Sequence, residues 1–105
     1  MADQPEPRAP VVQQVPGTIY SPLRNRARIL GSGLEVFEII GPYRLVGEDF
    51  AQLHEWFHWL SGEQLRAAIA FAEANPEFVD AELAEMEAAE QRIRARQSVL
   101  RAERQ

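Results

Sequence analysis

Two histidines and a glutamate lie in the order that zinc-dependent hydrolases use. Residues 54–58 read His-Glu-Trp-Phe-His, which matches the pattern H-E-x-x-H. On a helix, His54 and His58 would share one face and could chelate zinc, while Glu55 would activate a bound water. Such enzymes also need a third ligand and a cleft, for which 105 residues leave little chain. A zinc hydrolase is therefore the least favoured hypothesis, and we expect a protein that is not an enzyme and holds no metal or cofactor.

Arginine supplies the remaining chemistry, because all eleven basic residues are arginines. Sixteen acids outnumber them and give a net charge of −5, so any contact with nucleic acid must come from a local basic patch. Two such patches stand out, one near each end of the chain. The first holds Arg24, Arg26 and Arg28, and the second holds Arg92, Arg94, Arg96, Arg101 and Arg104.

The first patch has the spacing of a strand. Arginines at every second position would lie on one face of an extended chain, where they could contact DNA phosphates. Residues 28–36 predict two short strands around a turn at residues 31–33, which read Gly-Ser-Gly. The predicted DNA-binding residues are Arg24, Arg26 and Arg28, together with Gln64 and Arg66 from a later helix.

Composition excludes several other classes of protein. The chain has no cysteine, so it forms no disulfide, has no catalytic thiol and binds no metal through sulfur. It has no apolar run of roughly 18–20 residues, the length that a bilayer-spanning helix needs. Its first residues lack the apolar core of a signal peptide. We expect a cytoplasmic protein that makes no membrane contact.

Proline marks one end of the expected domain. Five of the seven prolines lie in residues 1–22, which predicts a disordered leader. We expect a helix-turn-helix domain over residues 23–90 and a basic helical arm over residues 91–105. The predicted fold is mainly α: a three-helix helix-turn-helix unit with a short N-terminal β element and a long C-terminal helix.

Apolar spacing and capping residues place the short helices. Residues 36–46 and 50–60 repeat apolar side chains at helical intervals. Ser61 and Gln64 form a capping box for the next helix, which the pair Asn75-Pro76 ends. Two large aromatic side chains are expected in the core or at a dimer contact, namely Trp56 and Trp59.

The second and third helices have the size of a helix-turn-helix pair. The recognition helix would then present Gln64 and Arg66 near its N-terminus. It also carries two acids, Glu63 and Glu73, against a single base, and this charge opposes phosphate binding.

The last helix is predicted over residues 76–101 and carries a coiled-coil seam. Apolar side chains recur along it with a seven-residue repeat, interrupted by the polar Glu90 and Gln97. Residues 76–90 hold six acids and no base, whereas residues 91–105 hold five arginines and one acid. The residues expected to form a homodimer are Val79, Leu83, Met86 and Ile93. The basic end could enter an acidic pocket of a partner, and its predicted contacts are Arg92, Arg94, Arg96 and Leu100.

Several short segments resemble, in order and spacing, the bacterial family called domain of unknown function 433. Residues 31–40 are similar to its signature G-T-R-I-P-V-x-x-I-V, and Tyr43-Arg44 and residues 47–50 follow at the family's spacing. Residues 59–73 are similar to its segment LS-x-EQL-x-AAL-x-YAE, and residues 75–80 to its ending HPEEID. The resemblance covers roughly residues 18–90.

This resemblance implies a dimeric helix-turn-helix protein with a short N-terminal β element. Members of the family look like VapB-type antitoxins and are often paired with PIN-like ribonuclease toxins. The turn and second helix would span residues 60–73. Gly33 and Glu35 stand where the signature has arginine and proline, so any contact that the family's arginine makes is lost in this chain.

The leading hypothesis is an antitoxin-like protein of a bacterial type II toxin-antitoxin pair, which neutralises a PIN-like toxin and binds operator DNA weakly. Its acidic surface would suit a toxin whose RNA-binding surface is basic. The alternative is a protein–protein interaction module that binds no DNA.

Overall fold

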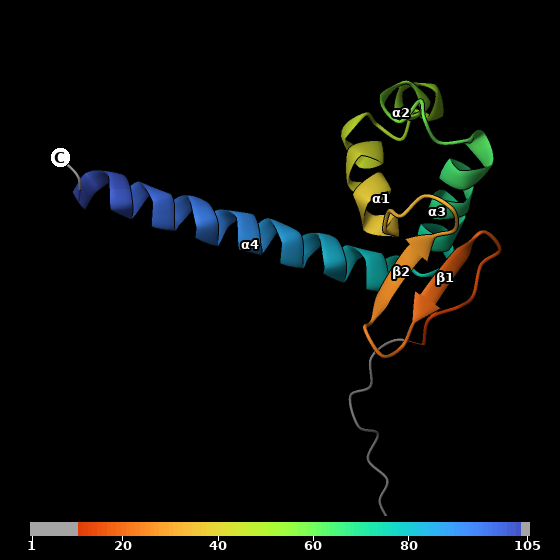
Figure 1. Ribbon diagram of the computed structural model, residues 1–105, viewed down its shortest axis with the longest axis horizontal. Helices are drawn as coiled ribbons and strands as arrows, with labels where there is room; N and C mark the ends of the chain where they lie inside the picture. The colour runs from red at the N-terminus through yellow and green to blue at the C-terminus, as the bar shows by residue number, and fades with distance from the viewer. Residues whose placement is uncertain (1–10, 104–105) are drawn as a thin grey trace, which may run out of the picture.

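Residues 11–103 are described by a computed structural model, and they are mainly helical (Figure 1). In chain order they form strands β1 (Thr18–Ser21) and β2 (Arg26–Ile29), then helices α1 (Val36–Leu45), α2 (Phe50–Trp56), α3 (Gly62–Ala74) and α4 (Pro76–Glu103). The strands form an antiparallel hairpin that packs against α3 and α1. The predicted fold class, helices with a short N-terminal β element and a long C-terminal helix, is confirmed.

The hairpin alternates buried and exposed side chains, as a half-buried strand does. Its register pairs Thr18 with Ile29. Ala27 and Ile29 lie in the core, which leaves Arg26 and Arg28 on the exposed side of β2. The interpretation from alternate spacing is therefore confirmed for these two arginines.

The strand predicted after the turn at residues 31–33 is wrong. Only a single bridge forms there, between Arg28 and Glu35. Glu35 is the N-cap of α1, which begins at the next residue and draws the chain into a helix. The partner of β2 comes instead from residues 18–21, before the arginine patch.

The disordered leader predicted for residues 1–22 is wrong for its second half, while residues 1–10 lie outside the described residues. Two valines of residues 11–15 pack against the core. The backbone of Gln13 forms two hydrogen bonds with the side chain of Asn75. A turn at Pro16-Gly17 then leads into β1. Long-range contacts therefore order a segment whose proline content is typical of disorder.

The connection from α2 to α3 is a tight turn. Helix α2 ends at Trp56, about one turn earlier than the sequence predicts, and the Leu60 amide donates to the Phe57 carbonyl at 3.0 Å. Leu60 is thereby buried in the core. The predicted capping box of α3 is confirmed, because the Ser61 hydroxyl accepts from the Gln64 amide and the Gln64 side chain accepts from the Ser61 amide.

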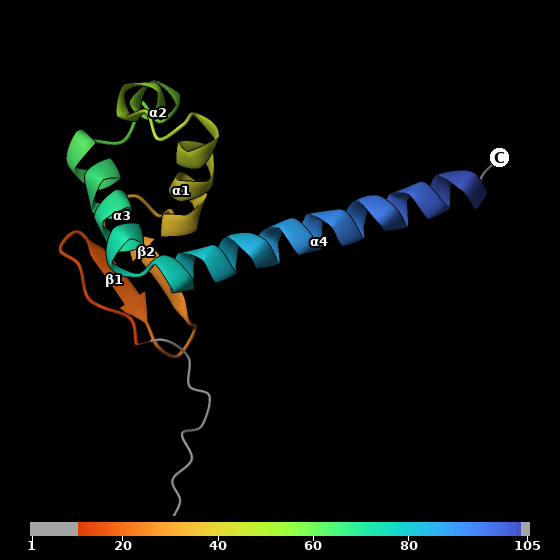
Figure 2. The same cartoon turned by 180° about the vertical axis from the view of Figure 1, so that it is seen from behind.

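Helix α4 begins inside the core and then leaves the body of the molecule, which we define as residues 11–83. Val79 is fully buried, and Leu83 packs against Gly41 of α1. Beyond this point the helix projects outwards, as opposite views show (Figures 1 and 2). Its 28 residues span about 42 Å at 1.5 Å per residue. Among residues 11–103, no helix has both the length and the apolar composition of a membrane span.

Candidate functional site

The projecting part of α4, residues 84–101, is the most exposed element of the described chain. Every residue of this segment except Ala89 is exposed. The exposed side chains include large apolar ones, and the exposed fraction is 44% for Met86, 58% for Ile93 and 51% for Leu100. Most helical stability in proteins comes from packing an apolar face, and within residues 11–103 this face packs against no other element. We refer to residues 84–101 as the α4 arm.

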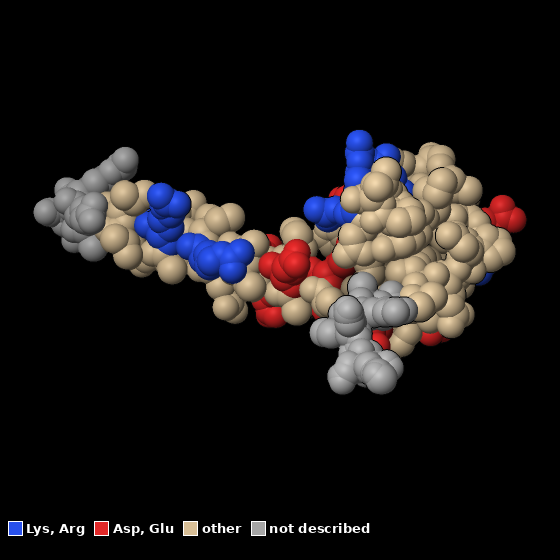
Figure 3. All heavy atoms as spheres, turned by 90° about the horizontal axis from the view of Figure 1, so that it is seen from below, with Lys and Arg blue, Asp and Glu red and all other residues tan. Residues whose placement is uncertain are grey.

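Charge changes sign along the α4 arm. Acidic side chains gather where α4 leaves the body, and arginines lie farther out (Figure 3). Acids near the N-terminus and bases near the C-terminus of a helix interact favourably with its dipole. Among the described residues, one ion pair involves α4, and it joins Asp80 to Arg44 at 2.8 Å. The predicted partner-binding residues Arg92, Arg94, Arg96 and Leu100 all lie exposed on this arm.

The predicted dimer seam is only partly available. Val79 is wrong as a dimer contact, because it is fully buried in the core of its own chain. Leu83 is half-buried against the same core. Met86 and Ile93 are exposed, and the seam continues through Leu100. The surface open to a partner therefore begins at Met86, seven residues beyond the point where the sequence pattern begins.

A groove of about 260 Å³ lies beside the base of the arm. Phe37 of α1 together with Phe78 and Met86 of α4 provide its apolar lining, and Arg24 and Arg26 approach from the hairpin. The groove therefore has a mixed apolar and charged lining, at the point where the exposed seam meets the body.

The same groove holds a carboxylate that the sequence analysis missed. Among the described residues, Glu82 Oε1 is buried without a hydrogen-bond partner. Burial raises the pKa of Glu82 to about 7, and the nearby Glu35 and Glu85 add to the shift while Arg26 opposes it. The sequence holds one signal for this site. Glu82 lies three residues after Val79, and residues at this spacing share one face of a helix, here the inner one.

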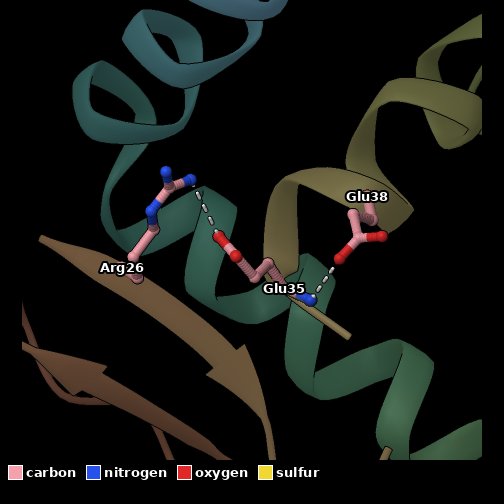
Figure 4. Close-up of polar contacts among 3 residues, drawn as sticks. All are labelled: Arg26, Glu35 and Glu38. Atoms are coloured by element: carbon pink, nitrogen blue, oxygen red, sulfur yellow. Dashed lines mark hydrogen bonds and ion pairs between the residues drawn. The ribbon is translucent and has the colours of Figure 1, made fainter. Parts of the chain in front are cut away.

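The hairpin arginines lie near one another but are not equally free. Arg24 lies in the turn between the strands, and Arg26 Nη1 lies 3.3 Å from Glu35 Oε1 (Figure 4). The Glu35 amide in turn donates to Glu38 Oε2 at 2.9 Å, which completes the N-cap of α1. Arg24, Arg26 and Arg28 also line an open groove of about 500 Å³ on the outer side of the hairpin. This groove gathers all three hairpin arginines, with Glu35 as its acidic member.

The polar residues predicted to contact DNA from α3 are engaged within the protein. Gln64 Oε1 accepts from Ser61, and Gln64 Nε2 donates to the Leu30 carbonyl at 3.1 Å. The Arg66 guanidinium lies over the Phe50 ring, 4.9 Å from its centroid. Helix α3 also packs against α1, α4 and both strands. It is the central packing element of the body, and its exposed residues are Glu63, Arg66 and Glu73.

The histidines do not share one face of a helix. Because α2 ends at Trp56, His58 lies in the following turn, where its ring contacts Trp59. His54 Nε2 lies 3.0 Å from the Leu60 carbonyl oxygen. Within residues 11–103, no group of three or more histidine, aspartate or glutamate side chains is arranged to hold a metal ion. The spacing that motivated the zinc hypothesis is therefore not realised as a chelating pair.

The two tryptophans are wrong as core residues. Trp56 and Trp59 are both about half exposed, although Trp59 contacts Phe57, which packs against the core. They lie at the end of α2 and in the turn after it, far along the chain from the α4 arm.

Comparison with known proteins gives this chain no relative: no family model, no curated protein and no solved structure matches it.

Proposed function

We propose that this protein is an antitoxin-like protein that neutralises a PIN-like ribonuclease toxin through the α4 arm. The observation that carries the proposal is the exposure of the arm, which holds four large apolar side chains and a run of arginines away from the body. The resemblance to the family called domain of unknown function 433 supplies the class of partner. The proposed site of action is the bacterial cytoplasm, and the proposed active form is a homodimer.

The chemistry of the arm suits a protein partner. An isolated helix in water gains little stability from its backbone alone, so an exposed amphipathic helix is stabilised when a partner covers its apolar face. Arginine guanidinium groups bind carboxylates in a bidentate geometry, and this geometry makes such a contact directional. Arg92, Arg94 and Arg96 follow one another along the arm, within reach of an acidic groove on a partner.

Binding to operator DNA is the weaker half of the proposal. The exposed hairpin arginines Arg24 and Arg28 favour it, since they carry no ion pair among the described residues. Helix α3 disfavours it, because Gln64 and Arg66 are held in internal contacts and two of the three exposed side chains of α3 are acidic. An interaction module that binds no DNA is therefore the second candidate function.

The experiment that tests the proposal is co-purification with PIN-like ribonucleases encoded beside this gene. The full chain is expected to retain such a protein, and the double variant Arg92→Glu/Arg96→Glu is expected to lose it. The matched control Arg24→Glu/Arg28→Glu reverses two hairpin arginines and should leave capture intact. Failure of the full chain to retain any of these proteins, or equal capture by both double variants, would contradict the proposal.

The same two variants separate the two candidate functions. We expect the full chain to bind its own promoter region. This binding should weaken as the salt concentration rises, and it should depend on Arg24 and Arg28. If the protein shows no preference for the promoter sequence at low salt, the function is that of the second candidate, an interaction module that binds no DNA.

A further inference from the structure

The α4 arm carries an apolar stripe that no other described residue covers. Met86, Ile93 and Leu100 lie seven residues apart, so they fall along nearly the same line of the helix, and all three are exposed. Glu90 and Gln97 lie between them on the same seam and are also exposed. A seven-residue repeat of this kind fits another helix of the same repeat better than it fits a sheet or a loop.

We propose that a second copy of this chain covers the stripe, with the two α4 arms paired antiparallel. In the register we propose, Gln97 faces the partner's Met86 and Glu90 faces the partner's Ile93. The twofold axis then lies between residues 91 and 92. Each of these layers thus joins one apolar side chain with one polar side chain, whose carbon chain can cover its neighbour while its polar end reaches water.

Charge complementarity supports the antiparallel direction. One flank of the seam holds Glu87, Arg94 and Arg101, again at intervals of seven residues. In the antiparallel pair, Glu87 lies beside the partner's Arg94 and Arg94 beside the partner's Glu87. Opposite charges across a helix pair set its orientation, and here the acidic half of each arm meets the basic half of the other.

The parallel direction meets repulsion along the same seam. It would place Glu82 beside the partner's Glu87 and Arg96 beside the partner's Arg101, following the usual flanking contacts of parallel coiled coils. It would also place Glu90 against the partner's Glu90 inside the seam. Like charges at these three levels disfavour the parallel arrangement.

The shape of the molecule leaves room for the antiparallel pair. The body lies at the N-terminal end of α4 (Figures 1 and 2), so two antiparallel copies hold their bodies at opposite ends. The partner's Leu100 would then reach the level of Leu83, where α1 covers the seam. Beside that level lies the groove at the base of the arm, whose mixed apolar and charged lining would face the end of the partner's arm.

This pairing deepens the homodimer of the proposed function and rests on it; it assigns the apolar stripe to the second copy and leaves to the toxin the arginines that face away from the seam. Arg92 lies on the side of the helix away from the seam, about 130° around the axis at 100° per residue, so it stays available to another protein. The test below uses the purified chain alone, so its result is distinct from the result of toxin capture.

The absence of cysteine in the chain permits a direct test of orientation. We would oxidise the full-length variants Met86→Cys and Gln97→Cys separately and as an equimolar mixture. Antiparallel pairing predicts a covalent two-chain species that joins one variant to the other in the mixture, and none from either variant alone, because identical positions lie far from each other along the axis. The matched control mixes Ala88→Cys with Ala95→Cys, on the outer face, and should give no such species.

Two results would overturn the proposal. Cross-linking of Gln97→Cys to itself would show parallel arms. Absence of the mixed species, or its formation to the same extent in the outer-face control, would show that the arms do not pair through this seam.

Discussion

The side-chain amide of Asn75 forms two hydrogen bonds with the backbone of Gln13, 62 residues earlier in the chain. The Gln13 amide donates to Asn75 Oδ1 at 2.7 Å, and Asn75 Nδ2 donates to the Gln13 carbonyl at 3.1 Å. Asn75 Nδ2 also donates to the Phe71 carbonyl at the end of α3. Asn75 is buried at the junction of α3 and α4, so one residue joins the N-terminal segment to the base of the arm.

Replacing Asn75 with Ala should destabilise the fold strongly. The substitution removes three hydrogen bonds and leaves the Gln13 amide and carbonyl without partners, at a cost of about 3 kcal/mol in the free energy of unfolding, while the Phe71 carbonyl still accepts from the backbone amide of residue 75. Chemical denaturation followed by circular dichroism measures this change. Gln14→Ala, at an exposed neighbouring position, is the control and should change stability by less than about 0.5 kcal/mol. Equal stability of the two variants would contradict the structural role of Asn75.

Two glycines allow a matched comparison of backbone strain and close packing. Gly17 and Gly33 have φ angles of 87° and 74°, a region that L residues rarely adopt. A Cβ at position 17 would lie 2.8 Å from Ala67 Cβ, whereas a Cβ at position 33 would meet nothing within 4 Å. Gly33→Ala should therefore cost about 1 kcal/mol from strain alone, and Gly17→Ala about 3 kcal/mol because the hairpin must also move away from α3. Denaturation of both variants measures the difference, and equal losses would show that the hairpin does not pack against α3 as described.

The buried carboxylate of Glu82 predicts an unusual dependence of stability on pH. Its pKa in the folded state is raised from 4.5 to about 7, so between these values the folded protein holds a proton that the unfolded chain releases. The contribution of this group to stability is therefore lost as pH rises from about 4.5 to about 7, and it changes little above that. Because Glu82 is only partly buried, solvent screening reduces the effect to about 1 kcal/mol.

Glu82→Gln should remove this loss and make the protein about 1 kcal/mol more stable at pH 8 than the original chain. Denaturation at pH 5 and at pH 8 measures the effect. Glu73→Gln, on the exposed side of α3, serves as the control and should leave the difference between the two pH values unchanged. If the original chain gained stability relative to Glu82→Gln between pH 5 and pH 8, the raised pKa of Glu82 would be contradicted.

Charge reversal at the seam provides a test of antiparallel pairing without cross-linking. Glu87→Arg and Arg94→Glu should each weaken self-association about tenfold, because each replaces two attractive contacts with two repulsive ones. A mixture of the two variants should associate as well as the original chain, since both positions are then basic in one chain and acidic in the other. Sedimentation equilibrium at low salt measures all three constants. Two variants that associate as tightly alone as in the mixture would count against the proposed register.

Local signals account for the parts of the fold that the sequence predicted. Ser61 and Gln64 cap α3 through contacts three residues apart, and the pair Asn75-Pro76 separates α3 from α4, so neighbours in the chain determine both boundaries. The long α4 follows from its composition and its seven-residue repeat. These features do not depend on what the helices pack against.

The errors arise where long-range contacts decide. β1 lies among prolines, and its order depends on β2 and on Asn75, which are distant in sequence. Val79 and Met86 belong to the same repeat, but the pattern cannot show that the body covers the first and leaves the second exposed. Glu82 was missed for the same reason, because its burial depends on the position of the hairpin and of α1. Arg26 and Arg28 were placed correctly on the exposed face of a strand because strand periodicity is local, whereas Arg24 lies in the turn before β2.

The mass of the full chain in solution tests most directly whether the α4 arm is a protein-binding surface that a second copy occupies. Sedimentation velocity at low salt, over concentrations up to on the order of 100 µM, should show a species of twice the 11.9 kDa chain mass that dissociates as salt rises. Ile93→Asp, at the centre of the exposed seam, should shift the protein to the single-chain mass without loss of the body's fold. A single-chain mass of 11.9 kDa at every concentration, or a dimer that Ile93→Asp leaves unchanged, would contradict pairing through the arm.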